Sequence, residues 1–164
     1  MSAGESTQAL IARLGLEPHP EGGWFRRIHT AAATVKTANG PRAQVSSIHY
    51  LLTADQPRGR LHRNRSDILH YLQGGGPVEY LLLDEAGSLR RVTLGSAPGQ
   101  ALFLHVPGGV WKASQLIGAA AHALVSEAVV PGFDFADHAF ADERLLAVHP
   151  AHAAVLRPFV RPAS

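Results

Sequence analysis

Beyond residue 15, hydrophobic positions fall into short runs that alternate with polar positions, and each run ends at Gly, Pro, Asn or Asp. A period of two is typical of half-buried β-strands, and short strands at this even spacing indicate an all-β sandwich or barrel. The predicted strands cover residues 44–53, 59–64, 67–73, 77–84, 88–94, 101–106, 110–117 and 122–130. No repeat or linker divides the 164 residues, so we expect one domain, with the barrel over about 20–140.

Both ends of the chain have a helical pattern instead. Ser2 and Glu5 have the spacing of a capping box, and Gly15 follows the next apolar positions, which predicts a short helix over about 5–14. The tail, about 141–164, is expected to form short helical segments that end before prolines.

Composition narrows the class of protein. Apolar residues make up 46% and charged residues 17%, which is typical of a globular chain rather than a disordered one. The absence of cysteine excludes disulfides, a cysteine nucleophile, iron–sulfur clusters and thiolate zinc sites. No apolar run is long enough to span a membrane, and the N-terminus lacks the apolar segment of a secretory signal. We therefore expect a cytoplasmic protein.

Charge gives no reason to expect nucleic acid or a membrane as a partner. The net charge is only +2, and no run of five or six like charges occurs. Ten histidines are present, and because histidine titrates near neutral pH, the position of each one is of interest.

The stretch over residues 59–74 is richest in reactive side chains. His62 and Asn64 share one face of the predicted strand, and a turn after them brings Asp67 back towards His62. A histidine beside a carboxylate is an oriented base or a pair of metal ligands, although a histidine hydrogen-bonded at the barrel rim is the structural alternative. His70, three positions after Asp67, is expected to face the opposite side unless a β-bulge turns it inward.

A second stretch, over residues 103–113, passes through a Pro-Gly-Gly turn and continues into Trp111 and Lys112. These two side chains are adjacent, so if one faces the interior the other should not. Trp111 is either a stacking wall for a ligand or part of the core. Lys112 either binds an anion, acts as an acid with a lowered pKa, or is simply solvated.

Further candidates lie outside these two stretches. Residues 20–25 form either a lid whose Glu21 or Trp24 contacts a ligand, or an edge strand whose glycines permit close packing. Phe133 and Phe135 share a face and could wall a pocket. The predicted catalytic residues are His62, Asp67 and Lys112, and the predicted substrate-binding residues are Glu21, Trp24, Arg26, Tyr50, Asn64, Trp111 and Phe133.

The two stretches resemble the two motifs of the cupin superfamily, G-x5-H-x-H-x3,4-E-x6-G and G-x5-P-x-G-x2-H-x3-N. His62, Asn64, Asp67 and Gly74 occupy the positions of the first motif. Pro107 and Gly109 match the second motif, whereas Lys112 replaces its histidine and Leu116 replaces its asparagine.

The chain is most similar to the DUF985, or Cupin_5, branch of that superfamily. Four blocks occur in the family's order, over residues 18–25, 62–70, 107–113 and 130–135. Family members commonly read Asp-Glu-x-Trp-His where this chain has Ser-Asp-Ile-Leu-His, and this chain is one residue shorter between its two histidines. The resemblance implies a double-stranded β-helix, which is a small jelly-roll barrel with a pocket inside, and pairing into a homodimer.

The resemblance also bears on metal binding. Cupins that bind a metal typically use three histidines and one carboxylate, and the equivalent positions here are His62, Asn64, Asp67 and Lys112. Only two of these are ordinary ligands, and the lysine would repel a cation. We therefore expect no cofactor, apart from a divalent metal held weakly, for which His62, Asp67 and His70 are the candidate ligands.

Three functions fit these residues. The first is a metal-independent isomerase or epimerase in which His62 acts as a base on a sugar derivative, such as a sugar nucleotide, or on a small oxo acid. The second is a small-molecule binding barrel without turnover. The third is a metal-dependent cupin enzyme, an oxygenase or a lyase. Asn64 and Lys112 favour the first over the third.

Overall fold

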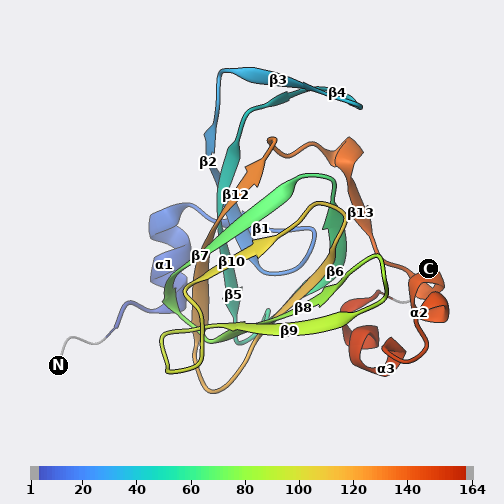
Figure 1. Cartoon of the computed structure of the whole chain (residues 1–164). Helices are drawn as coiled ribbons and strands as arrows, with labels where there is room; N and C mark the ends of the chain where they lie inside the picture. The colour runs from blue at the N-terminus through green and yellow to red at the C-terminus, as the bar shows by residue number, and fades with distance from the viewer. Residues whose placement is uncertain (1–3, 162–164) are drawn as a thin grey trace.

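Two antiparallel sheets face each other and enclose the interior of the molecule (Figure 1). The computed structural model describes residues 4–161. The larger sheet has the order β1 (Glu17–Pro18), β2 (Trp24–Thr30), β5 (Ser46–Thr53), β12 (His122–Val130), β7 (Asp67–Gly75) and β10 (Phe103–Val106). The smaller sheet has the order β13 (His138–Phe140), β6 (Arg58–Asn64), β11 (Trp111–Leu116), β8 (Val78–Leu83) and β9 (Leu89–Leu94). The all-β fold predicted from the alternating pattern is confirmed.

Strand β12 illustrates how the alternation builds the core. Ala123, Val125 and Val129 are buried at every second position, and the intervening side chains are less buried. Glu127 occupies an inward position of the same register and is also buried. The main core between the sheets consists of Tyr50, Leu52, Val78, Tyr80, Leu82, Leu94, Leu104, Val106, Leu116 and Ala123.

The N-terminal helix α1 (Thr7–Leu14) packs on the outer side of the larger sheet. Its N-cap is Ser6, whose hydroxyl accepts a hydrogen bond from the Ala9 amide, and it ends at Gly15 in the left-handed conformation, with φ 61°. Ser2, which the sequence suggested as the cap, lies outside the described residues. The predicted helix is thus confirmed, with its start two residues later.

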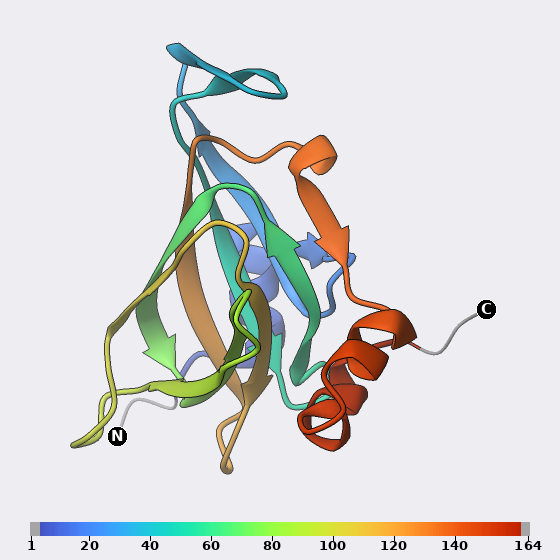
Figure 2. The ribbon, with the colours of Figure 1, turned by 45° about the vertical axis from the view of Figure 1, so that its right-hand side comes forward.

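The C-terminal segments cover the outer face of the smaller sheet. They comprise α2 (Glu143–Val148), α3 (Ala153–Leu156) and the 3-10 turn η2 (Arg157–Phe159). Leu61 is fully buried and packs with Leu146, Leu156 and Phe159. Figures 1 and 2 show these segments and α1 on opposite sides of the barrel. Side chains that alternate with Leu61 on β6 therefore point into the barrel.

Residues 26–30 of β2 and the hairpin of β3 (Thr34–Thr37) and β4 (Gly40–Ala43) were not predicted as strands, and for residues 20–25 an edge strand was only one of two alternatives. Most of β2 is exposed, and the hairpin projects beyond the body of the barrel (Figures 1 and 2). An exposed strand needs no apolar face, so its sequence does not alternate.

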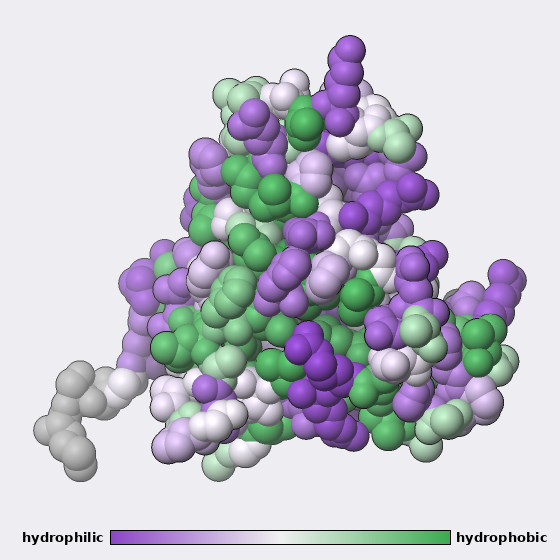
Figure 3. Space-filling view, in the orientation of Figure 1, coloured by the Kyte–Doolittle hydropathy of each residue, from purple (hydrophilic) through white to green (hydrophobic). Residues whose placement is uncertain are grey.

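Apolar and polar side chains are mixed over the face of the molecule shown in Figure 3. The exposed large hydrophobic side chains of the molecule include Tyr71 and Phe103, whose ring centroids are 5.2 Å apart. No helix among residues 4–161 is both long enough and apolar enough to span a lipid bilayer.

Tyr80 provides a test of the core. Its side chain is almost fully buried, and among residues 4–161 its hydroxyl has no hydrogen-bond partner. Because an unpaired buried hydroxyl costs about 1–3 kcal/mol, Tyr80→Phe should leave the free energy of unfolding unchanged or raise it by up to about 1 kcal/mol. Urea unfolding measures this change, and a clear loss of stability would contradict it.

Candidate active site

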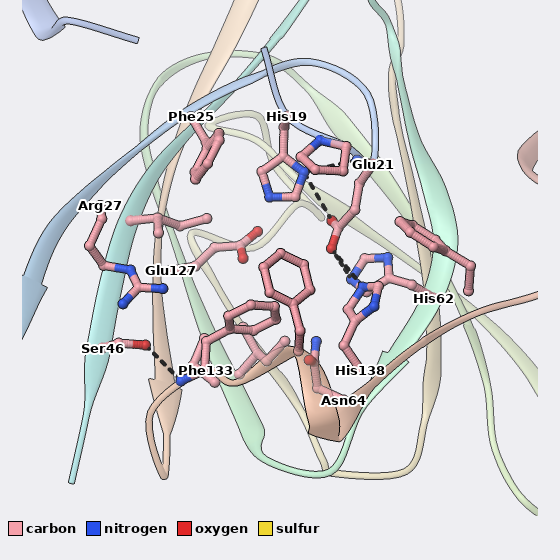
Figure 4. A pocket seen from close by; sticks show the side chains of 16 residues that line it. His19, Glu21, Phe25, Arg27, Ser46, His62, Asn64, Glu127, Phe133 and His138 are labelled. Atoms are coloured by element: carbon pink, nitrogen blue, oxygen red, sulfur yellow. Dashed lines mark hydrogen bonds and ion pairs between the residues drawn. The ribbon is translucent and has the colours of Figure 1, made fainter. Parts of the chain in front are cut away.

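A pocket of about 210 Å³ lies inside the barrel, between the two sheets (Figure 4). Its walls are largely aromatic and aliphatic, whereas its polar groups gather in two places. The lining residues are His19, Pro20, Glu21, Phe25, Arg27, Ser46, Ile48, His62, Asn64, Ile68, Glu127, Val129, Phe133, Phe135, His138 and Phe140.

The first polar group, which we call the histidine–glutamate cluster, consists of Glu21, His62 and His138. His62 Nε2 and His138 Nε2 each lie 3.2 Å from Glu21 Oε1. The two imidazole rings are stacked, with centroids 5.3 Å apart and planes inclined by 21°. Antiparallel pairing of β13 with β6 brings the two histidines together, since Phe140 pairs with His62 and His138 with Asn64.

The loop between β1 and β2 carries Glu21 into the pocket. Its backbone is fixed by the Arg60 amide, which donates to the Glu21 carbonyl at 2.6 Å, and by the Tyr50 hydroxyl, which donates to the Gly22 carbonyl at 2.7 Å. Gly23 has φ 75°, and a Cβ there would lie 2.6 Å from the Leu51 carbonyl oxygen. The glycine pair therefore permits the close packing that positions Glu21.

Hydrogen bonding determines which nitrogen of His62 faces Glu21. His62 Nδ1 lies 2.6 Å from the Arg60 carbonyl oxygen, which can only accept, so Nδ1 donates and Nε2 faces the carboxylate. Burial lowers the pKa of His62 to about 4, although Glu21 opposes this shift. Burial alone would raise the pKa of Glu21, but the attraction of His62 and the hydrogen bond from His138 lower it to about 2.

The second polar group, the lysine–glutamate cluster, consists of Lys112, His70 and Glu127, all buried. His70 Nδ1 donates to the Leu104 carbonyl at 3.1 Å, so His70 Nε2 accepts from Lys112 Nζ at 2.7 Å. Lys112 Nζ and His70 Nε2 each lie 3.6 Å from Glu127 Oε1. Burial raises the pKa of Glu127, and the Lys112 charge offsets only part of that shift. In Figure 4, Glu127 and Glu21 point into the pocket from opposite sides.

Four of the predicted site residues line this pocket: Glu21, His62, Asn64 and Phe133. His62 and Asn64 share an inward face of β6, as the strand period predicts. Lys112 is buried, so the solvated alternative is wrong.

The predicted pairing of His62 with Asp67 is wrong. Asp67 is exposed and accepts hydrogen bonds from the Gly108 amide and from His105 Nε2, both at 2.9 Å. Side chains at the start of β7 alternate between the two faces of the sheet, as predicted, but His70 faces the interior of the barrel and Asp67 faces solvent. The carboxylate beside His62 is Glu21, and the predicted ligand set of His62, Asp67 and His70 is not assembled.

Four predicted substrate-binding residues lie away from the pocket. Trp24 packs against α1, and Arg26 Nη1 donates to the Leu14 carbonyl at 3.2 Å. Trp111 packs with the C-terminal segments, because Lys112 takes the inward position beside it. Tyr50 belongs to the core, and its hydroxyl donates to the Gly22 carbonyl.

Five polar lining residues were missed: His19, Arg27, Ser46, Glu127 and His138. Glu127 carried a signal in the sequence, since it is the one acidic residue at an inward position among apolar side chains of β12. His138 carried none, because its strand has only three residues. Arg27 is the neighbour of Arg26, and the phase of an exposed strand could not be predicted.

Comparison with known proteins agrees with this fold. Residues 8–141 match the family Cupin_5, which is described as 'Cupin superfamily (DUF985)'. The uncharacterized protein YML079W of Saccharomyces cerevisiae is 38% identical over 170 residues, which cover 92% of this chain and 84% of that protein.

Solved structures give the same result. A hypothetical protein from Leishmania major has a TM-score of 0.88 at 30% identity, covering 94% of this chain and 98% of that one. A Shewanella oneidensis protein has a TM-score of 0.88 at 29% identity, covering 96% of this chain and 99% of that one. A dTDP sugar isomerase from Desulfovibrio desulfuricans, with a TM-score of 0.52 at 18% identity over 71% of this chain and 83% of that one, shares the fold alone. The chain belongs to the Cupin_5 (DUF985) family of the cupin superfamily.

Proposed function

We propose that this protein is an enzyme that moves a proton on a small anionic substrate, as an isomerase or epimerase does. The observation that carries the proposal is the pair of buried carboxylates, Glu127 and Glu21, that face each other across an apolar pocket. Ionisable groups on opposite walls of a largely apolar pocket are suited to proton transfer, because each can contact a different side of one substrate.

Glu127 is the group that we assign as the base. Burial raises its pKa, which makes it a stronger base than an ordinary carboxylate, and Lys112 Nζ holds it in place from behind. His62 was the expected base, but its Nδ1 is bonded to the Arg60 carbonyl and its Nε2 faces Glu21. We therefore assign His62 to the opposite cluster rather than to proton removal.

The reaction needs a base and a second group that stabilises negative charge. Glu127 takes a proton from a carbon next to a carbonyl, and the electron pair of that C–H bond moves onto the carbonyl oxygen to form an enolate. The positive charge suited to stabilising the enolate is that of Arg27, which lines the same pocket. Return of a proton from water to the opposite face of the same carbon completes an epimerisation. Isomerisation needs a hydroxyl on that carbon: its proton passes to the former carbonyl oxygen, it becomes the new carbonyl, and the carbon-bound proton is returned to the neighbouring carbon.

The pocket limits the size and charge of the substrate. Its volume of about 210 Å³ is smaller than the 300–1,000 Å³ usual for drug-sized ligands, so a nucleotide would have to lie outside it. Arg27 lines the pocket and is exposed, and its Nη1 contacts Thr30 Oγ1 at 3.1 Å. A guanidinium at this place is suited to a carboxylate. These features favour a small oxo acid over a sugar nucleotide.

Exchange of substrate protons into deuterated water tests the proposal. We expect NMR to detect exchange at the carbon next to the carbonyl in at least one member of a panel of small 2-oxo acids. Glu127→Gln should lower that rate by about 100-fold, because general-base catalysis typically contributes at least that much. Glu79→Gln is the matched control, since Glu79 lies on β8 and pairs with Arg91.

Two outcomes would contradict the proposal. One is binding of oxo acids by the wild-type protein without any exchange, which would instead indicate a binding barrel. The other is unchanged exchange in Glu127→Gln, with circular dichroism confirming that the variant is folded.

A further inference from the structure

The histidine–glutamate cluster brings together three donor atoms from three distant parts of the chain. One ligand atom from each of Glu21, His62 and His138 lies within 4.8 Å of the other two. From this convergence we infer that Glu21, His62 and His138 form a binding site for one divalent transition-metal ion. The inference goes beyond the proposed function and is tested without any substrate.

The nitrogen that His62 directs at Glu21 supports a cation between them. His62 Nδ1 donates to the Arg60 carbonyl, so Nε2 is the ring nitrogen that is left to face the Glu21 carboxylate oxygen, 3.2 Å away. Metal-bound histidines usually donate their other ring nitrogen to a carbonyl or a carboxylate, as His62 does here.

The spacing of the donor atoms also fits a metal. Ligand atoms about 2.1 Å from a tetrahedral ion are separated from one another by roughly 3.4 Å. The two contacts to Glu21 Oε1, each 3.2 Å, are close to that separation. Two of the three separations are thus close to those around a tetrahedral ion, and the two histidine nitrogens lie within 4.8 Å of each other.

This ligand set differs from the one implied by the cupin motifs. Of those motif positions only His62 takes part, because Asn64 and Lys112 replace two ligands and Asp67 faces solvent. Glu21 and His138 come instead from the loop before β2 and from β13. Asn64 adds an unsatisfied group to the same wall, since its buried Oδ1 has no hydrogen-bond partner among residues 4–161.

The chemistry of the donors limits the choice of ion. Two imidazoles and one carboxylate suit Zn(II), Fe(II), Co(II) or Mn(II), and disfavour Mg(II) and Ca(II), which prefer oxygen ligands alone. The positive charge of Lys112 acts on both Glu21 and His62, which weakens the binding of any cation. We therefore expect micromolar rather than nanomolar affinity.

Cobalt provides a direct test. Protein prepared without a histidine tag and freed of metal by a chelator is titrated with Co(II), and visible absorption reports its coordination. Titration calorimetry with Zn(II) supplies the stoichiometry. We expect one equivalent to bind, and His138→Gln to weaken binding by at least 10-fold, the lower end of the usual cost of disturbing a metal site.

His105→Gln is the matched control. It removes an exposed histidine that also lies beside a carboxylate, that of Asp67, and should leave the affinity unchanged. Glu21→Gln is a second variant at the cluster itself, and circular dichroism checks that each variant is folded. Failure of the wild-type protein to bind Co(II) or Zn(II), or unchanged binding in folded His138→Gln, would overturn the inference. Neither result depends on proton exchange by Glu127.

Discussion

Replacing Lys112 with methionine should destabilise the fold by about 3–5 kcal/mol, the usual cost of removing one partner from a buried ion pair. Lys112 is 4% exposed, and its Nζ is shared between His70 Nε2 at 2.7 Å and Glu127 Oε1 at 3.6 Å. Methionine preserves most of the side-chain volume, so the loss reports the missing charge and hydrogen bond rather than a cavity. Urea unfolding measures the change.

The loss should depend on pH in a definite direction. Burial and the charge of Glu21 already raise the pKa of Glu127, and loss of the Lys112 charge raises it further. A carboxyl whose pKa is higher in the folded state favours folding only while it is protonated. Destabilisation by Lys112→Met should therefore be small at acidic pH and grow as the pH rises through the folded-state pKa of Glu127. Burial is the main reason that the pKa of His70 lies well below its usual value, and burial persists in the variant.

A second substitution at Glu127 separates this explanation from a general packing defect. In the double variant Lys112→Met/Glu127→Gln, the buried charge is gone together with its partner, so most of the lost stability should return. Simple addition of the two single-variant effects, or a loss that is equal at pH 5 and pH 8, would contradict it.

Gly23→Ala should destabilise the fold by on the order of 3 kcal/mol. The loss has two causes: alanine disfavours the left-handed backbone conformation at this position, and its Cβ would overlap neighbouring atoms. Gly23 has φ 75°, and an added Cβ would lie 2.6 Å from the Leu51 carbonyl oxygen and 3.1 Å from Leu52 Cδ2. The carbonyl belongs to the paired strand β5 and cannot move away easily. The loop that holds Glu21 should shift instead, and metal binding and proton exchange should both fall.

Gly99→Ala is the control that isolates the overlap. Gly99 has φ 82°, but an added Cβ would meet nothing within 4 Å. The free energy of unfolding of this variant should fall by only about 1–2 kcal/mol, which is the cost of a left-handed conformation for alanine. Equal losses in the two variants would show that the Leu51 carbonyl does not constrain the loop.

The strands that enclose the pocket could be predicted because a strand that is buried on one face alternates apolar and polar residues in its sequence. The pattern on β12 locates every inward position, including that of Glu127, and Leu61 and His62 on β6 follow the same rule. The exposed β2 and the three-residue β13 escaped prediction, since neither has a buried apolar face.

The phase of β7 explains the main error at the site. Asp67 and His70 were correctly placed on opposite faces, but the sequence around them does not say which face is inside. Asp67 begins the strand beside the turn that follows β10, where the Gly108 amide and His105 bind its carboxylate outside the barrel. The carboxylate beside His62 is instead that of Glu21, whose loop comes near His62 only in the folded chain.

Glu21 and His138 are 117 positions apart in the sequence, and they meet at one carboxylate oxygen. Any ligand that bridges them joins the first strands of the barrel to the last one. The unfolded chain has no such site, because closing so long a loop costs entropy that two contacts do not repay. Occupancy of the cluster should therefore protect both ends of the barrel from proteases together, so that digestion of the loaded protein yields no product lacking only one end.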